Sequence, residues 1–400
     1  MNDRIKNETR VLWDKCFSEE DKRFVDFYFE KRYNENDNIF IEKDGKVVSA
    51  LQLISYPFSY YGKTIGCSYL SGCCTDPDYR SQGLMNDLII KALKQAKNNG
   101  ACFAALIPAS ESLFNYYAGT NFVTTFDYSK IRINLSHKDS ETQSHNVNES
   151  LGQKSSVSIS VFGSESVSES ESESDFYEVY EYFNNKMRAR NCCIQHNEYD
   201  FKVITDDLEL FDNHLLVAKY GEDICGLAFC YLRNGEIYIK DVFAESSAIF
   251  SDLITAATQW FRVTESPSHR VTKSESVSLP ESVSVSESVS INILIPPVAG
   301  QKTHRLGMAR LIDAETMLRL YAMSHPKMKM EISLVDTILP ENNGTYYINN
   351  GTLDKKNSIG TNVVDIEQLT QALFGYKTET LPEKLKAFNN QAAFMSLMLD

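Results

Sequence analysis

A strand, a short polar loop and a helix follow one another directly between residues 66 and 98. The run GCSYLSGCC (66–74) is apolar and predicts a strand, and MNDLIIKALKQAKN (85–98) has helical periodicity, with Gly100 just beyond its end. A strand that passes into a helix through so short a loop is typical of layered α/β domains. The loop between them, TDPDYRSQGL, begins at Thr75 and is the first place to look for function.

The neighbouring segments continue this alternation of strands and helices. Asp44-Gly45 between two apolar runs predicts a hairpin, and Ser110 is a helix N-cap. The remaining expected elements are a helix at 18–33, a strand at 102–108, a helix at 110–119 and strands at 121–126 and 129–135. Together they predict one mixed α/β domain over residues 1–137.

Composition divides the rest of the 400-residue chain, which is long enough for two or three domains. Residues 138–175 are rich in Ser and Glu and predict a disordered linker. Residues 176–300 predict a second α/β domain with a Ser-rich loop at 264–290, and residues 301–400 predict a third domain of strands and helices. We expect no function in the two Ser-rich stretches.

The net charge of -14 makes nucleic acid a poor partner and favours cationic ligands such as amines. The charged N-terminus has no apolar signal core, and no apolar run is long enough to span a bilayer. We therefore expect a cytoplasmic protein with no membrane partner.

The nine cysteines do not form a disulfide framework, as expected of a reduced compartment. Cys192, Cys193 and His196 could make half of a zinc site, but no second ligand pair follows at finger spacing. Buried thiols are the alternative, and we expect no metal.

The loop Arg80-Ser81-Gln82-Gly83-Leu84-Met85 lies between a strand and a helix N-terminus. Backbone N–H groups there converge beside the positive end of the helix dipole, which suits a pyrophosphate. Gly83 has no side chain, so a phosphate can approach the backbone closely. The alternative interpretation is a plain turn with a solvated arginine. The spacing is neither that of a P-loop nor that of a dinucleotide fingerprint.

The stretch TDPDYRSQGLMNDLI resembles the acetyl-CoA-binding motif of the GNAT acetyltransferases, although Met85 replaces the usual small residue. The resemblance implies that backbone groups of the preceding strand, at Cys73 and Thr75, bind the pantetheine arm and polarise the thioester. It therefore implies acetyl-CoA as co-substrate and direct transfer rather than a cysteine nucleophile. The cofactor-binding residues implied are Cys73, Thr75, Arg80, Ser81, Gln82, Gly83, Leu84 and Met85.

FNYYAGTNF resembles the Tyr-x-x-x-Gly-Phe segment of the same family. Tyr117 matches the tyrosine that protonates the departing CoA thiolate, and Phe122 matches the final aromatic. Asn121 replaces the glycine, and Asn also tolerates a left-handed turn. Tyr116 or Tyr117 could be simple core residues, but the spacing favours Tyr117 as the inward one.

LGMARLIDAETMLRLY and DIEQLTQALFGY resemble the C-terminal third of the Eis (enhanced intracellular survival) family. The resemblance implies two tandem GNAT-type mixed-sheet domains, the second degenerate, followed by a sterol-carrier-protein-like α+β domain at 301–400. It also implies N-acetylation of an amine of a cationic small molecule, such as an aminoglycoside or polyamine, or of lysine. Homo-oligomers, often hexamers, are implied as well.

In this family the terminal carboxylate reaches back into the first domain. Here that role falls to Asp400, and the apolar AAFMSLML before it predicts that the tail docks, whereas a frayed tail is the alternative. A non-catalytic acyl-CoA- or lipid-binding protein is the alternative function, because Met85 and Asn121 depart from the family pattern.

Overall fold

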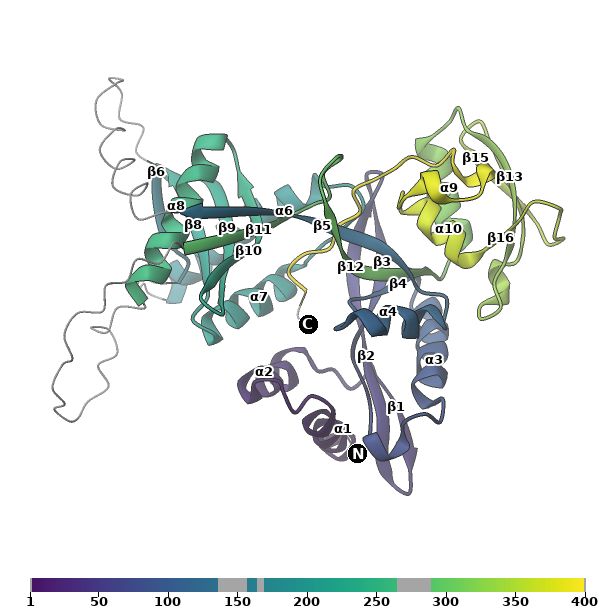
Figure 1. Cartoon of the computed structure of the whole chain (residues 1–400), viewed down its shortest axis with the longest axis horizontal. Coiled ribbons are helices and arrows are strands. Elements are labelled where there is room, and N and C mark those ends of the chain that lie inside the picture. The colour runs from purple at the N-terminus through teal and green to yellow at the C-terminus, as the bar shows by residue number, and fades with distance from the viewer. Residues whose placement is uncertain (1, 136–156, 164–168, 265–288, 399–400) are drawn as a thin grey trace. The chain divides into compact units, whose positions relative to one another are not determined.

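The computed structural model describes residues 2–135, 157–163, 169–264 and 289–398. The chain forms two compact units (Figure 1). The first contains residues 1–128, 187–207 and 296–400, and the second contains residues 129–186 and 208–295. Each unit is therefore assembled from segments far apart in the sequence.

The main sheet of the first unit has the order β1-β2-β3-β4-β12-β5, and the short β7 pairs with β2. Its antiparallel hairpin of β2 and β3 is followed by a parallel β3–β4 pair and an antiparallel β4–β12 pair. The strands are β1 (Asn38–Lys43), β2 (Lys46–Tyr60), β3 (Lys63–Thr75), β4 (Ala101–Leu106), β12 (Thr303–Leu311), β7 (Cys193–Ile194) and β5 (Val123–Leu135), which continues into the second unit. Residues near position 310 thus complete a sheet that begins near position 40.

Helices cover both faces of this sheet. On one face lie α1 (Asn2–Cys16), α2 (Lys22–Phe27) and the π-helical turn Tyr28–Arg32, and on the other lie α3 (Leu84–Asn98) and α4 (Glu111–Ala118) (Figure 1). Alternate residues of β2 supply the two cores, because successive side chains of a strand point to opposite faces. Thus Ile54 packs with the α1 side and Leu53 with the α3 side.

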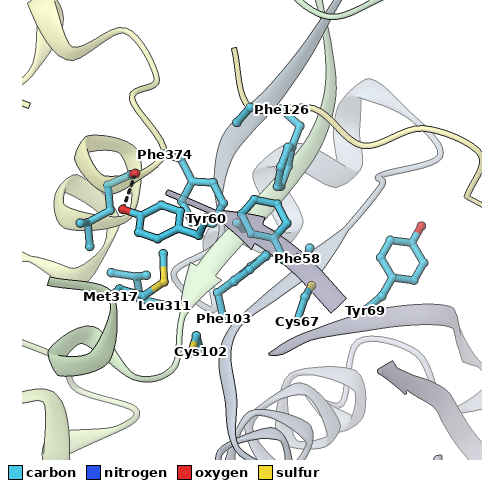
Figure 2. Packing of buried hydrophobic residues seen from close by; sticks show 14 of the residues in the cluster. Phe58, Tyr60, Cys67, Tyr69, Cys102, Phe103, Phe126, Leu311, Met317 and Phe374 are labelled. Carbon is cyan, nitrogen blue, oxygen red and sulfur yellow. Dashed lines mark hydrogen bonds between the residues drawn. The ribbon is translucent and has the colours of Figure 1, made fainter. Parts of the chain in front are cut away.

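The larger core joins the main sheet to the C-terminal part of the chain, as Figure 2 shows. Phe58, Phe103 and Phe126 pack around Phe374, with ring centroids 4.9–5.7 Å from it. Tyr60 is fully buried, and its hydroxyl donates to the carbonyl of Leu373 at 3.0 Å. These aromatic contacts hold the two segments together as one unit.

The C-terminal segment adds a four-stranded sheet of order β15-β14-β13-β16. Asp365 caps α10 by accepting from the N–H of Gln368 at 2.7 Å, and Gly375 takes positive φ just after the helix. Aspartate and glycine are residue types that are preferred at these two ends of a helix. The elements are α9 (Ala314–Ser324), β13 (Lys329–Val335), β14 (Gly344–Asn349), β15 (Thr352–Lys356), β16 (Val363–Asp365), α10 (Ile366–Leu373) and 3-10 turns at Pro340–Asn342, Thr378–Thr380 and Glu383–Leu385.

The second unit holds strands in the order β5-β11-β10-β9-β8-β6, with helices α6 and α8. Asn234-Gly235 joins β9 and β10 with both residues at positive φ, as expected for a tight hairpin. The elements are β6 (Val157–Val161), α6 (Glu169–Arg188, which ends in the first unit), β8 (His214–Tyr220), β9 (Asp223–Arg233), β10 (Glu236–Ala244), α8 (Ser247–Thr264) and β11 (Val289–Ile295). Helix α7 (Glu198–Leu210) starts in the first unit.

Within residues 1–137, the elements differ from the sequence prediction chiefly in three places. The helix expected at 18–33 begins only at Lys22, because Asp21 caps it by accepting from the N–H of Arg23. The two strands expected at 121–126 and 129–135 are one continuous strand, β5. Helix α1 was not predicted at all.

The linker at 138–175 was predicted to be disordered, and this is wrong for residues 157–161, which form β6 in register with β8, and for residues 169–175, which begin α6. The rest of that stretch lies largely outside the described residues, as does most of the Ser-rich loop 264–290. Among the helices that the structure describes, none is long and apolar enough to cross a membrane.

Candidate functional site

The site lies where β3 separates from β4. The two strands pair from Gly66 to Tyr69 on β3, but β3 runs on to Thr75. The far side of this stretch stays paired with β2, where Cys74 faces Ala50. Among the described strands, none pairs with this edge of residues 70–75, and its backbone groups can bind an extended ligand.

A cavity of about 610 Å³ occupies this split. It is lined by the end of β3, the loop that follows, the start of α3 and residues of α4 and α1. The lining residues are Cys16, Phe17, Cys73, Cys74, Thr75, Tyr79, Arg80, Ser81, Gly83, Leu84, Met85, Asn86, Leu113, Tyr116 and Tyr117. All the predicted site residues belong to this set except Gln82 and Asp400.

The loop reaches α3 through residues of left-handed conformation, Ser81 (φ 61°) and Gly83 (φ 78°). A short 3-10 turn at Pro77–Tyr79 precedes them. Gly83 is the N-cap of α3, and no side chain caps the helix there. The first N–H groups of a 15-residue helix therefore face the cavity side without a side-chain acceptor, which is the arrangement that binds phosphate groups.

In the second unit, a side chain caps the N-terminus of the corresponding helix. Ser246 Oγ accepts from the N–H of Ile249 at 3.3 Å at the start of α8. The sequence at this place, DVFAESSAIFSDLI (241–254), contains neither a glycine nor an arginine. The start of α8 therefore differs from the start of α3, where the N-cap residue has no side-chain acceptor.

Arg80 bends back over the end of β3. Its Nε donates to the carbonyl of Thr75 at 3.1 Å, and its Nη2 lies 4.0 Å from the Sγ of Cys16. The Cys16 thiol also donates to the Thr75 carbonyl at 3.3 Å. A hydrogen bond with Cys74 and, after it, the Arg80 guanidinium lower the pKa of Cys16 to about 7, although burial opposes this shift.

Tyr117 is the inward tyrosine of α4, as the spacing predicted. Its side chain is buried, whereas 43% of Tyr116 is exposed. Burial, and then the neighbouring Cys73 thiol, raise the pKa of Tyr117 well above that of a free phenol, so it stays protonated at neutral pH. Burial likewise raises the pKa of Cys73 to about 12. A thiol this weakly acidic is a poor nucleophile, which agrees with direct transfer.

Of two further predicted residues, Asn121 has the expected backbone conformation, whereas Gln82 lies outside the cavity lining. Asn121 adopts the left-handed conformation (φ 63°) that the family's glycine would supply. Gln82 is exposed, and its Oε1 accepts from Lys43 Nζ of β1 at 2.8 Å, outside the cavity lining.

Gly72 lets α1 approach β3 closely. It has φ 58°, and a Cβ added there would lie 1.9 Å from Cζ2 of Trp13. The indole thus packs directly on the backbone beside Cys73. Trp13 also packs against Tyr28 with the two rings tilted, at 4.5 Å between ring centroids.

The apolar tail docks on the first unit, as predicted, for residues 393–398. Phe394 exchanges backbone hydrogen bonds with the segment that holds β7, to the carbonyl of Cys192 at 2.9 Å and from the N–H of Ile194 at 3.2 Å. Two residues further, the Ser396 carbonyl accepts from His196 Nε2 at 2.9 Å. Asp400 lies outside the described residues.

The cysteines of the zinc alternative are buried beside this tail. Cys193 donates its thiol to the Ile194 carbonyl, and His196 binds the tail. Within the part of the chain that the structure describes, no group of three or more His, Cys, Asp or Glu side chains is placed to hold a metal ion.

Comparisons with known proteins identify the class of protein. Residues 4–122 match the family described as an acetyltransferase (GNAT) domain, and residues 314–393 match the sterol carrier protein domain. The chain therefore carries an acetyltransferase domain of the GNAT superfamily, which uses acetyl-CoA, and a C-terminal sterol carrier protein domain. These two matched domains agree with the first and the last domain that the resemblance to the Eis family implies.

Solved structures agree on the fold across nearly the whole chain. A probable N-acyltransferase from Enterococcus faecalis has a TM-score of 0.66 at 15% identity and covers 94% of this chain and 89% of its own. Eis1 from Mycobacterium abscessus has a TM-score of 0.64 at 11% identity, with 100% and 98% covered. A GCN5-related N-acetyltransferase from Kribbella flavida has 0.63 at 16%, with 98% and 95% covered. The search of curated proteins finds no match.

Sequence reasoning missed Cys16 and Phe17 in the cavity, because α1 was not predicted. The apolar spacing of Ile5, Leu12, Trp13 and Cys16 is helical and could have indicated this helix.

Proposed function

We propose that the chain is an N-acetyltransferase that transfers the acetyl group of acetyl-CoA directly to an amine. The single observation that carries this proposal is the cavity in which the unpaired edge of β3, the open N-terminus of α3 and the Tyr117 side chain meet. A ligand with an extended arm, a pyrophosphate and a thioester needs these three features in this succession.

Each part of the site has a role in the proposal. N–H groups of residues 80–85 bind the pyrophosphate, and backbone groups from Cys73 to Thr75 bind the pantetheine arm and polarise the thioester carbonyl. The neutral amine attacks this carbonyl carbon, and the C–S bond breaks. Tyr117 donates its proton toward the departing thiolate.

The amine must lose a proton before or during attack, and the Asp400 carboxylate is the group proposed to receive it. Its support is the docking of residues 393–398 on the first unit, because this docked stretch ends two residues before Asp400. His196 holds the tail at Ser396, four residues before Asp400. The candidate acceptors from the sequence are aminoglycosides, polyamines and lysine.

The test is thiol release from acetyl-CoA by the full chain with no tag at its C-terminus, measured against an aminoglycoside, a polyamine, lysine and further amines. Release with any class supports the proposal, and the Tyr117→Phe variant serves as the control for adventitious hydrolysis. Saturable acetyl-CoA binding with no release from any amine would overturn it in favour of a non-catalytic acyl-CoA-binding protein.

The family resemblance also supports a homo-oligomer, such as a hexamer, that acts in the cytoplasm. Light scattering of the purified full chain measures the first property, and localisation of the full chain in its own cells tests the second.

A further inference from the structure

Two free thiols on different elements line the cavity of the proposed acetyl-CoA site. Cys16 is the last residue of α1, and Cys74 is the next-to-last residue of β3. Their side chains are hydrogen-bonded to each other. Neither thiol takes part in the proposed transfer of the acetyl group. We call them the Cys16–Cys74 pair.

The alternation of side chains along β3 makes Cys74, rather than Cys73, the partner of Cys16. Successive side chains of a strand point to opposite faces. Cys73 packs with the core on the α3 side, where it is hydrogen-bonded to Tyr117. Cys74 belongs to the core on the α1 side, against which Cys16 also packs.

The close approach of α1 to β3 at Gly72 brings the two thiols together. The Trp13 indole lies against the backbone of Gly72, and Cys16 follows Trp13 by about one helical turn. The Cys16 thiol therefore reaches β3 just beyond Gly72, where it donates to the carbonyl of Thr75 at 3.3 Å. The ends of helices fray, so Cys16 can make the small movement that brings two hydrogen-bonded sulfurs to the S–S bond length of about 2.05 Å.

The two thiols differ as a reactive cysteine differs from its resolving partner. Cys16 is half-buried, and its Sγ lies 4.0 Å from Arg80 Nη2. The hydrogen bond with Cys74 and then the Arg80 guanidinium lower the pKa of Cys16 to about 7, so much of it is thiolate at neutral pH. Cys74 is only 3% exposed, and burial raises its pKa well above that of a free thiol. An accessible thiolate beside a second thiol is the combination found in oxidation-sensitive cysteines.

We propose that the Cys16–Cys74 pair is a peroxide-reactive site, in which hydrogen peroxide converts the two thiols to a disulfide in the cavity wall. The Cys16 thiolate attacks one peroxide oxygen and the O–O bond breaks, which leaves a sulfenic acid and a hydroxide that takes up a proton. The Cys74 sulfur then attacks the Cys16 sulfur, the S–O bond breaks, and the Cys74 proton leaves with the hydroxyl group as water. Two thiols are thereby oxidised, and one peroxide is reduced to two waters.

The pair lies beside the backbone groups that are proposed to bind the pantetheine arm. The Cys16 thiol and Arg80 Nε both donate to the Thr75 carbonyl, so the disulfide removes one of these two donors. A bound acetyl-CoA should cover the pair and shield it from peroxide. This shielding rests on the proposed function, whereas the disulfide itself does not.

Peptide mapping of the full chain tests the inference after reduction and treatment with stoichiometric hydrogen peroxide. Trypsin places Cys16 in residues 16–22 and Cys74 in residues 64–80, so the disulfide joins two peptides. We expect mass spectrometry to find these joined peptides, with fragment ions that assign the bond to Cys74 and not to Cys73. Dithiothreitol should separate them again.

Two variants make the test specific. In Cys74→Ala, oxidation should stop at the sulfenic acid of Cys16, which dimedone traps, because the resolving thiol is gone. Cys225→Ser is the matched control, since Cys225 belongs to the second unit and burial raises its pKa. This variant should form the Cys16–Cys74 disulfide at the wild-type rate.

The outcomes separate this inference from the proposed function. A Cys16 that stays reduced while Cys225 is oxidised, or a disulfide from Cys16 to Cys73, would overturn the inference. If Cys74→Ala fails to fold, the map of the wild-type chain still decides between these results. Acetyl-CoA at about ten times its Kd should slow disulfide formation about tenfold, because only the unoccupied fraction reacts. A disulfide that forms equally fast with acetyl-CoA bound would overturn the proposed path of the pantetheine arm and leave the peroxide-reactive pair standing.

Discussion

The contact between Gly72 and Trp13 makes a strong test of how the site is built. In Gly72→Ala, the new Cβ would lie 1.9 Å from Trp13 Cζ2, whereas real Cβ contacts stay beyond 3.0 Å. The indole cannot yield easily, because it is 4% exposed and packs on Phe17, Tyr28 and Phe29 at 4.5–5.2 Å. Displacing the indole should lower the free energy of unfolding by about as much as removing it would, about 3–5 kcal/mol.

The matched control is Gly62→Ala, in the hairpin that joins β2 and β3. Gly62 also has positive φ (72°), but nothing lies within 4 Å of its added Cβ. This variant should lower the free energy of unfolding by only about 1 kcal/mol, because only the strain of the left-handed conformation is added. The difference between the two variants isolates the clash with Trp13.

Fluorescence can follow the first unit by itself. The chain has two tryptophans, and Trp260→Phe leaves Trp13 as the only reporter. In that background Gly72→Ala should lower the melting temperature by about 6–20 °C. Trp13→Ala should then relieve part of the cost, so that circular dichroism finds the double variant more stable than the sum of the single effects. A Gly72→Ala variant as stable as Gly62→Ala would refute the reasoning.

Three further predictions concern the site. Tyr117→Phe should lower kcat about a hundredfold with little change in acetyl-CoA binding, because only the proton donor is lost; an unchanged kcat in steady-state assays would exclude that role. Alkylation of Cys16 by iodoacetamide, followed by mass spectrometry, should increase as pH rises through about 7, where the thiolate forms, and Arg80→Ala should shift this midpoint upward. Cys73 should stay unmodified in that range, since its pKa is about 12, and early labelling of Cys73 would contradict the burial argument. Removal of residues 399–400 should abolish most turnover without changing the melting temperature, and full activity of the truncated chain would exclude the Asp400 carboxylate as proton acceptor.

Local chemistry explains which parts of the fold could be predicted. Asp44-Gly45 forms a tight turn, and Asp365 caps α10. Both features are predictable because turns and helix caps depend on a few adjacent residues. The loop from Arg80 to Gly83 was predicted for the same reason. In each case the residue types themselves determine the backbone conformation.

Non-local pairing explains most of what could not be predicted. The place of β12 beside β4, and that of β7 beside β2, depends on partners some 200 and 140 residues away in sequence. Periodicity predicts that a segment is a strand but does not identify its neighbour.

The pairing of β4 with β12 also determines when the sheet can be completed during synthesis of the chain. At about 5–20 residues per second, the partner of Phe103 leaves the ribosome about 10–40 s after Phe103 itself. During that interval one edge of β4 and the apolar surface around Phe58 have no cover from the C-terminal segment. We expect chaperones to bind a nascent chain in this state, because its strand edge and apolar surface are exposed. For the same reason, residues 1–137 expressed alone should aggregate and should not form a small acetyltransferase.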